Sequence, residues 1–239
     1  GRMNSLDIEH LRSLGTDEFM AVNPYPFYNG PALTEQGFSD LLDNMPPLSM
    51  FNEIMGKERR AGQAPHDRYS LEYTPNMPVP EPWQAFIAEL CSEDYRREIQ
   101  RLLGAKKVEF RFHWHYTPSG ADVSPHCDAR RERGSHLFYF NSKQDWDPSW
   151  GGATLALDDG GRLDYNSAPA LEEFDDIIEF DSFGNYSALM LRTDHAWHAV
   201  RPIECPEDKL RRVFIVVVNP DSLFWKVRDR VVGKNIQRF

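Results

Sequence analysis

The feature that most constrains the fold is a change of hydrophobic period after Gly104. In KVEFRFHWHY, residues 107–116, apolar and aromatic residues alternate with Glu, Arg and His. This two-residue period is typical of a β-strand, whose successive side chains point to opposite faces. Further short strands are predicted at residues 136–141, 153–157, 187–192, 198–203 and 213–218, with Gly- and Pro-containing turns between them. Such a series indicates a β-sandwich or a β-barrel.

The first third of the chain has a helical period instead. In LTEQGFSDLLDNM, residues 33–45, Thr34 is a favourable N-cap, and Leu33 and Phe38 are spaced for a hydrophobic staple. A later helix is predicted between Ser92, as its N-cap, and Gly104, which ends it. We expect residues 1–104 to form a helical and irregular layer that packs on a β core of residues 105–239, within one structural domain.

Composition narrows the function classes. The 239 residues contain 27 basic and 37 acidic side chains, a net charge of −10, which argues against nucleic acid as a partner. Three cysteines fit a reducing cytoplasm better than a disulfide scaffold. No apolar run has the length of a membrane span, and no signal peptide opens the chain. We therefore expect a cytoplasmic globular protein that binds neither membranes nor nucleic acid.

The stretch HWHYTPSGADVSPHCD, residues 113–128, contains three histidines and two aspartates. Strand alternation places His113 and His115 on the polar face, so we predict that both are surface residues rather than ligands. The Glu that a cupin site would require shortly after this HxH pair is missing. His126 and Asp128, two residues apart in an extended segment, project to one side.

One imidazole and one carboxylate are two of the three ligands of the facial triad that binds non-haem Fe(II). The third ligand must come from a distant strand. The residues themselves leave two candidates, His195 and His198, in TDHAWHAVRPI.

Five motifs between Phe110 and Asp221 resemble the Fe(II)/2-oxoglutarate-dependent dioxygenases, in particular their prolyl-4-hydroxylase-like branch. They are HCD, LFYFNS, WDPSWGGATLAL, TDHAWHAVRPI and LRRVFIVVVNPD, in this order. The resemblance selects His198 over His195 and implies a metal site of His126, Asp128 and His198. It also implies a double-stranded β-helix, a mainly β, cupin-like jelly-roll barrel with iron in its mouth. That fold agrees with the strands expected above.

The resemblance further implies Fe(II), 2-oxoglutarate as cosubstrate, and O₂, with ascorbate as an additional candidate cofactor. The distal carboxylate of 2-oxoglutarate needs a cation, for which the planar fork of Arg is suited. If residues 205–209 turn a hairpin centred on Glu207, Arg212 shares the face of His198, about 13 Å along the strand. A shift of one residue would select Arg211 instead. We predict Arg212.

Two tyrosines, Tyr116 and Tyr139, match positions that contact 2-oxoglutarate in prolyl-hydroxylase-like enzymes; the alternative is that both are core aromatics. Trp150-Gly151-Gly152 is interpreted as a structural turn before a strand. The basic loop of residues 129–134 is interpreted as solvated, with recognition of an acidic group as the alternative.

The predicted function is a hydroxylase that converts 2-oxoglutarate to succinate and oxidises a prolyl, protein or small amino-acid-like substrate. The alternative is a metal-binding β-helix protein without turnover, acting as a binding or regulatory module. A zinc hydrolase is a third possibility, but it has no evident use for Arg212 and no placed Glu as base.

Two further segments are not covered by the family resemblance. Residues 158–181 form an acidic excursion that is expected to flank the mouth, and its most acidic part, residues 172–181, is predicted to be a solvated loop or edge hairpin. The C-terminal residues 224–239 have the pattern of an amphipathic helix, which would pack on the sheet or on the second subunit of a homodimer.

Overall fold

The computed structural model describes residues 4–56, 62–64 and 67–220, and its strands form two antiparallel sheets. The larger sheet has seven strands, in the order β1 (Phe27–Gly30), β9 (Ser187–Leu191), β6 (Gly134–Tyr139), β11 (Arg211–Pro220), β4 (Val108–Thr117), β3 (Arg68–Glu72) and β2 (Asn52–Ile54). The smaller sheet has four, in the order β5 (Val123–His126), β10 (Trp197–Val200), β7 (Thr154–Asp158) and β8 (Asp176–Glu179). The predicted jelly-roll architecture is confirmed.

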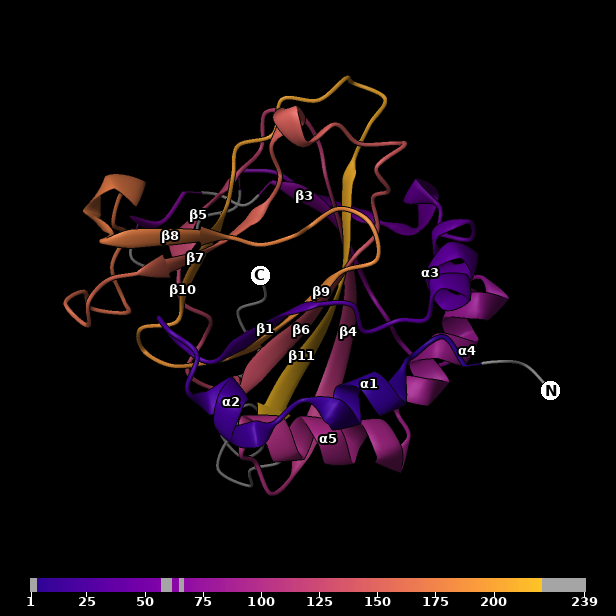
Figure 1. Ribbon diagram of the computed structural model, residues 1–239. Helices are drawn as coiled ribbons and strands as arrows, with labels where there is room; N and C mark the ends of the chain where they lie inside the picture. Colours follow the sequence, from indigo (N-terminus) through magenta and orange to yellow (C-terminus); the bar gives the residue numbers. More distant parts are fainter. Residues whose placement is uncertain (1–3, 57–61, 65–66, 221–239) are drawn as a thin grey trace, which may run out of the picture.

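Helices from the first part of the chain cover one face of the larger sheet (Figure 1). They are α1 (Ile8–Ser13), α2 (Thr16–Met20), α3 (Glu35–Leu42), α4 (Glu81–Leu90) and α5 (Glu93–Leu103). The predicted caps are confirmed. The Thr34 hydroxyl accepts from the Gly37 amide at 3.0 Å, and Gly104 ends α5 with a left-handed φ of 64°.

The first 104 residues supply more than the expected helical layer. Strand β1 pairs with β9 at one edge of the larger sheet, and β3, followed by β2, extends its other edge beyond β4. Sequence analysis did not identify these three strands. They are short, and their residues do not alternate as cleanly as those of β4.

The aromatic face of β4 packs under the helices. Trp114 lies 5.3 Å from Trp83 of α4, between ring centroids, and Tyr116 and Phe112 belong to the same buried cluster. The opposite face of β4 points toward the smaller sheet, so it too is buried: His113 and His115 are each 2% exposed. Their predicted surface position is wrong, because the second sheet covers the polar face that alternation alone would assign to solvent.

The predicted hairpin between residues 198 and 212 is also wrong. Strand β10 pairs with β5 and β7 in the smaller sheet, whereas β11 lies between β4 and β6 in the larger one. Residues 201–210 therefore carry the chain from one sheet to the other, and the expected hairpin centred on Glu207 does not form. This crossing decides which arginine faces the barrel interior.

The acidic excursion packs on the back of the smaller sheet. Its apolar side chains contact the outward-facing residues of β7 and β10, such as Leu155, Leu157 and Trp197. Within it, β8 pairs with β7 as an edge strand, which agrees with the edge hairpin predicted for residues 172–181. The predicted C-terminal helix lies outside the described residues. In the part of the chain that the structure describes, no helix combines the length and apolarity needed to cross a membrane.

Candidate metal centre and its pocket

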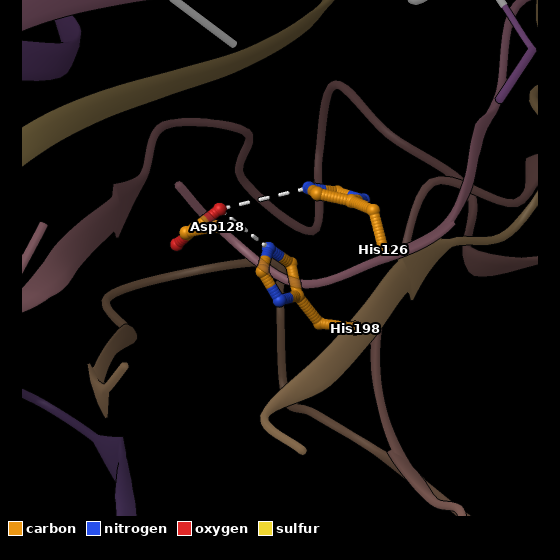
Figure 2. Close-up of side chains that lie close together, drawn as sticks. All are labelled: His126, Asp128 and His198. Carbon is orange, nitrogen blue, oxygen red and sulfur yellow. Dashed lines mark ion pairs between the residues drawn. The ribbon is translucent and has the colours of Figure 1, made fainter. Parts of the chain in front are cut away.

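Three side chains from two strands converge at one end of the smaller sheet. His126 ends β5 and lies directly across from His198 of β10, and Asp128 follows β5 by two residues. Figure 2 shows the two imidazoles and the carboxylate pointing toward one another. The Asp128 Oδ1 atom is 3.6 Å from His126 Nε2 and 3.4 Å from His198 Nε2. One ligand atom from each residue lies within 4.8 Å of the others.

Hydrogen bonds at the far side of each ring fix the histidine orientation. His126 Nδ1 lies 3.0 Å from the Ser124 carbonyl oxygen, and His198 Nδ1 lies 3.3 Å from that of Ala196. A carbonyl oxygen can only accept, so Nδ1 of each ring carries the proton and Nε2 presents its lone pair toward Asp128. This arrangement is typical of metal-ligating histidines, whose second nitrogen donates to the backbone.

The spacing of the three donors fits a metal ion. Ligand atoms about 2.1 Å from a metal lie roughly 3.0 to 3.5 Å apart when the angle between them is near 90 to 110°. Burial raises the pKa of Asp128, but His198 and His126, when their rings are protonated at both nitrogens, outweigh it through their charge and hydrogen bonds and hold this pKa well below its usual range. Two neutral imidazoles and one carboxylate, all from one side, match the facial donor set preferred by Fe(II).

Arg211 is the cation of the same pocket. The pocket wall facing the metal ligands comes from the larger sheet and includes Val213, Ile215 and Arg211, which is 4% exposed. Its guanidinium donates from Nε to the Gly152 carbonyl at 2.6 Å and from Nη2 to Thr154 Oγ1 at 3.2 Å. Burial lowers the pKa of Arg211 to about 10, so the group is still charged at neutral pH.

No carboxylate among the described residues forms an ion pair with Arg211. Its recorded partners are neutral: a backbone carbonyl, a hydroxyl, and the Tyr139 ring, whose centroid is 6.0 Å from the guanidinium carbon. A buried charge paired only with neutral groups is costly, and an anionic ligand would offset that cost. Gly152, interpreted from the sequence as part of a structural turn, thus also positions this cation.

Arg212 lies on the other face of the sheet, and its predicted position beside His198 is wrong. It pairs in register with Tyr116 on β4, and both side chains belong to the helix-covered face. Arg212 Nη2 is 3.1 Å from Asp145 Oδ2. The physical reason is the crossing of residues 201–210, which shifts the inward position to Arg211.

Like the two arginines, Tyr116 and Tyr139 lie on opposite faces of the larger sheet. Tyr116 stacks on Phe51, with centroids 4.2 Å apart, and its hydroxyl donates to the Pro46 carbonyl at 2.8 Å. It is a core aromatic on the far side of the sheet from the metal ligands. Tyr139 faces the interior, pairs in register with Val213, and donates its hydroxyl to Thr154 Oγ1 at 2.8 Å. Tyr139 thus supports the same hydroxyl that Arg211 contacts.

His195 does not join the cluster. Its Nδ1 lies 2.7 Å from Asp159 Oδ2, and the same oxygen accepts from the Trp197 indole at 3.0 Å. The structure therefore brings His198, and not His195, to His126 and Asp128.

The basic loop after Asp128 is largely engaged within the protein. Arg130 donates from Nε and Nη2 to the two oxygens of Asp194, at 3.2 and 2.8 Å, and its guanidinium lies 4.1 Å from the centre of the Tyr165 ring. Arg133 donates to the Leu103 carbonyl at 2.9 Å. These contacts tie the metal-ligand segment to the excursion and to the end of α5.

No protein-family model and no curated protein matches the sequence. Solved structures, however, share its fold over most of its length. A prolyl-4-hydroxylase from Pseudomonas putida is 15% identical with a TM-score of 0.57, covering 90% of this chain and 97% of its own. A prolyl hydroxylase from Trichoplax adhaerens, in complex with a peptide of hypoxia inducible factor, is 13% identical with a TM-score of 0.58, covering 96% and 94%.

A third similar structure is the non-haem α-ketoglutarate-dependent carbocyclase SnoK from nogalamycin biosynthesis. It is 10% identical with a TM-score of 0.58, covering 92% of this chain and 87% of its own. The chain therefore has the double-stranded β-helix fold of the 2-oxoglutarate-Fe(II) oxygenases, as the sequence resemblance implied.

Proposed function

We propose that this protein is an Fe(II)- and 2-oxoglutarate-dependent dioxygenase. The proposal rests on one observation: two kinds of functional group, which come from different sheets, line the same pocket. On one wall are three convergent metal donors, and on the other is a buried arginine whose recorded partners are all neutral. A metal and an anion are the ligands that these groups require.

His126, Asp128 and His198 would hold the metal. A facial set of three protein ligands leaves three positions for other groups, and a single carboxylate offsets part of the metal charge. When bound, Fe(II) with 2-oxoglutarate and O₂ supplies oxidative decarboxylation to succinate and CO₂, with transfer of one oxygen atom to a C–H bond of the substrate. The chain contributes the donor geometry and a pocket that limits the access of water.

Arg211 would bind the distal carboxylate of 2-oxoglutarate. Its planar fork can donate two parallel hydrogen bonds to a carboxylate, and the low exposure of the site strengthens each of them. Gly152 and Thr154 hold the guanidinium from one side, and Tyr139 braces Thr154. This set replaces the predicted one of Arg212, Tyr116 and Tyr139 by Arg211, Thr154 and Tyr139.

Hydroxylation of a prolyl, peptide or small amino-acid-like substrate is the reaction we infer, in the cytoplasm. The Trichoplax adhaerens neighbour was solved in complex with a peptide fragment, which supports a peptide substrate, whereas SnoK is a carbocyclase from nogalamycin biosynthesis. None of the three cysteines, Cys91, Cys127 and Cys205, forms a disulfide with another described residue, which suits a reducing compartment. Ascorbate is an additional candidate cofactor, and the succinate assay described below can be run with and without it.

The experiment is an assay of succinate formed from 2-oxoglutarate, with Fe(II) and O₂, without added substrate. Slow uncoupled turnover is expected from the wild type, and Asp128→Ala should abolish it because the metal loses its anionic ligand. If the wild type binds Fe(II) but produces no more succinate than Asp128→Ala, the protein is a metal-binding module without turnover and the proposal fails.

A further inference from the structure

A second basic side chain faces the pocket beside Arg211. His115 lies on β4, is 2% exposed, and is among the residues that line the pocket together with the three metal donors. It belongs to the HWH motif, from which the sequence analysis drew no function. Because His115 lies in the barrel interior rather than on the surface, its ring can contact a ligand bound in the pocket.

The register of the larger sheet fixes the relation of His115 to Arg211. Arg211 lies across from Thr117, and Val213 lies across from His115, so His115 and Arg211 are diagonal neighbours on the inner face. Such neighbours have backbones about 7–8 Å apart, within reach of long side chains that converge on one ligand. Tyr139 flanks Val213 from the opposite side, on β6.

The other polar groups near Arg211 in the pocket are Thr154 of the smaller sheet and Ser135 of the larger sheet. The Thr154 hydroxyl accepts from both Arg211 and Tyr139. Ser135 lies across from Val217, two positions beyond Ile215 and so further along the sheet from Arg211. The other residues that the larger sheet contributes here are Leu137, Val213 and Ile215, which are apolar. His115 is therefore the side chain best placed to add a hydrogen bond beside the Arg211 site.

We infer that His115 donates a hydrogen bond to a carboxylate of the bound 2-oxoglutarate and so acts with Arg211 in selecting a dicarboxylate cosubstrate. The inference rests on the proposed function. A hydrogen bond to an ionised carboxylate in a buried site is stronger than one between neutral groups, and its loss leaves the carboxylate poorly satisfied. Removing it should weaken 2-oxoglutarate binding about tenfold.

His113 provides a matched control. It lies on the same strand and the same face, is equally buried, and is not among the residues that line the pocket. Its Nε2 lies 3.8 Å from Glu72 Oε1 on the neighbouring strand β3. Substitution of His113 therefore tests the general cost of removing a buried histidine from β4 without removing a pocket contact.

The experiment is calorimetric titration of 2-oxoglutarate into anaerobic, Fe(II)-loaded wild type, His115→Leu, His115→Gln and His113→Leu. The expected result is a Kd about tenfold higher for His115→Leu, a partial recovery in His115→Gln because its amide still donates, and a Kd within twofold of wild type for His113→Leu. Fe(II) affinity should be unchanged in all three. An unchanged 2-oxoglutarate Kd in His115→Leu, or an equal loss in His113→Leu, would overturn the inference.

A measurement on the wild type covers the case in which the variants do not fold. In the Zn(II)-loaded protein, the ring nitrogen resonances of His115 should shift when 2-oxoglutarate is added, and those of His113 should not; shifts absent from His115 would contradict the inference. Failure of the proposed function is distinguishable, because then the metal-loaded wild type itself shows no 2-oxoglutarate binding.

Discussion

At the scale of single residues, the pocket depends on which of two adjacent arginines faces it, because that side chain is the one that an anionic ligand could contact. Arg211 and Arg212 differ by one position, and this difference places them on opposite faces of β11. One is buried with neutral partners beside the metal donors, and the other forms an ion pair with Asp145 behind the sheet. Substitution of each residue therefore separates the pocket face from the helix-covered face.

Arg211→Ala should raise the Kd for 2-oxoglutarate by about a hundredfold, because two charge-assisted hydrogen bonds are lost from a buried site. Arg212→Ala is the matched control and should change this Kd by less than threefold. The measurement is 2-oxoglutarate binding to the Fe(II)-loaded, oxygen-free protein. Equal losses in the two variants would mean that β11 does not present Arg211 to the ligand.

The sequence could not settle this choice. Alternation grouped His126 with Asp128 because the two flank a single residue, and the family resemblance selected His198. In β11, however, both faces are apolar: Val213, Ile215 and Val217 point inward, and Phe214, Val216 and Val218 point outward. A strand buried on both faces carries no periodic signal, so its register had to be inferred from a turn that the structure does not contain.

At the scale of elements, α5 rests on β6 through a buried polar contact. The Tyr95 hydroxyl of α5 lies 2.7 Å from His136 Nδ1 of β6, and both side chains are fully buried. Burial lowers the pKa of His136 to about 3. The folded state therefore holds His136 neutral at pH values where the unfolded chain, with a pKa of about 6.5, takes up a proton.

His136 should make the protein acid-sensitive. Its contribution to stability is complete above pH 6.5 and is lost as the pH falls from 6.5 toward 3, by about 1.5 kcal/mol between pH 6.5 and 5. Between pH 6.5 and 5, the free energy of unfolding measured in urea should therefore fall by about 1.5 kcal/mol less in His136→Gln than in the wild type. His10→Gln, which changes a half-buried histidine of α1, is the control. An identical fall in wild type and His136→Gln would contradict the assignment.

The acidic excursion is fastened to the smaller sheet by one carboxylate. Asp159 is 2% exposed, and it accepts from the Trp197 indole, from the amides of Gly161 and Leu163, and pairs with His195. Burial raises the pKa of Asp159, but these contacts outweigh it and the pKa is lowered. The carboxylate thus stabilises the fold at neutral pH and loses this effect below about pH 4.

Asp159→Asn should lower the free energy of unfolding at pH 7 by about 1–3 kcal/mol, because the amide cannot accept at both oxygens. Asp164→Asn, an exposed residue in the same loop whose carboxylate accepts from the Asn166 amide, is the control and should change stability far less. Urea unfolding at pH 7 provides the comparison. Equal effects would mean that the excursion is not held at Asp159.

The alternation of β4 predicted the strand and its faces but not which face is wet. The aromatic side chains of Phe112, Trp114 and Tyr116 were expected to be core, and they are. His113 and His115 were assigned to solvent because polarity usually marks the exposed face. The helices cover one face of the strand and the smaller sheet covers the other, and His115 on the inner face lines the pocket.

At the scale of the whole molecule, the larger sheet divides the protein into two parts. Its outer face and the helices form an aromatic core centred on Trp83, whose ring lies 4.9 Å from both Phe140 and Phe214. Its inner face and the smaller sheet enclose the pocket. The larger buried apolar cluster therefore lies on one side, and the proposed ligand-binding groups lie on the other.

Trp83→Leu should lower the free energy of unfolding by about 2–4 kcal/mol, because it leaves a cavity among fully buried aromatic rings. The Kd for 2-oxoglutarate should stay within twofold of wild type at a temperature where the variant is folded. Urea unfolding and ligand titration on the same preparation test both statements. A parallel loss of ligand affinity would show that the two sides of the sheet are coupled.

We propose that one pocket binds Fe(II) and chelates 2-oxoglutarate. An anaerobic titration of the protein with Fe(II) and then 2-oxoglutarate, followed by visible absorbance, tests this directly. Chelation of the keto acid by Fe(II) should give a charge-transfer band that requires both additions, because 2-oxoglutarate fills two open metal positions. We expect this band in the wild type and its absence in Asp128→Ala. Fe(II) binding to the wild type with no band after saturating 2-oxoglutarate would contradict the proposal.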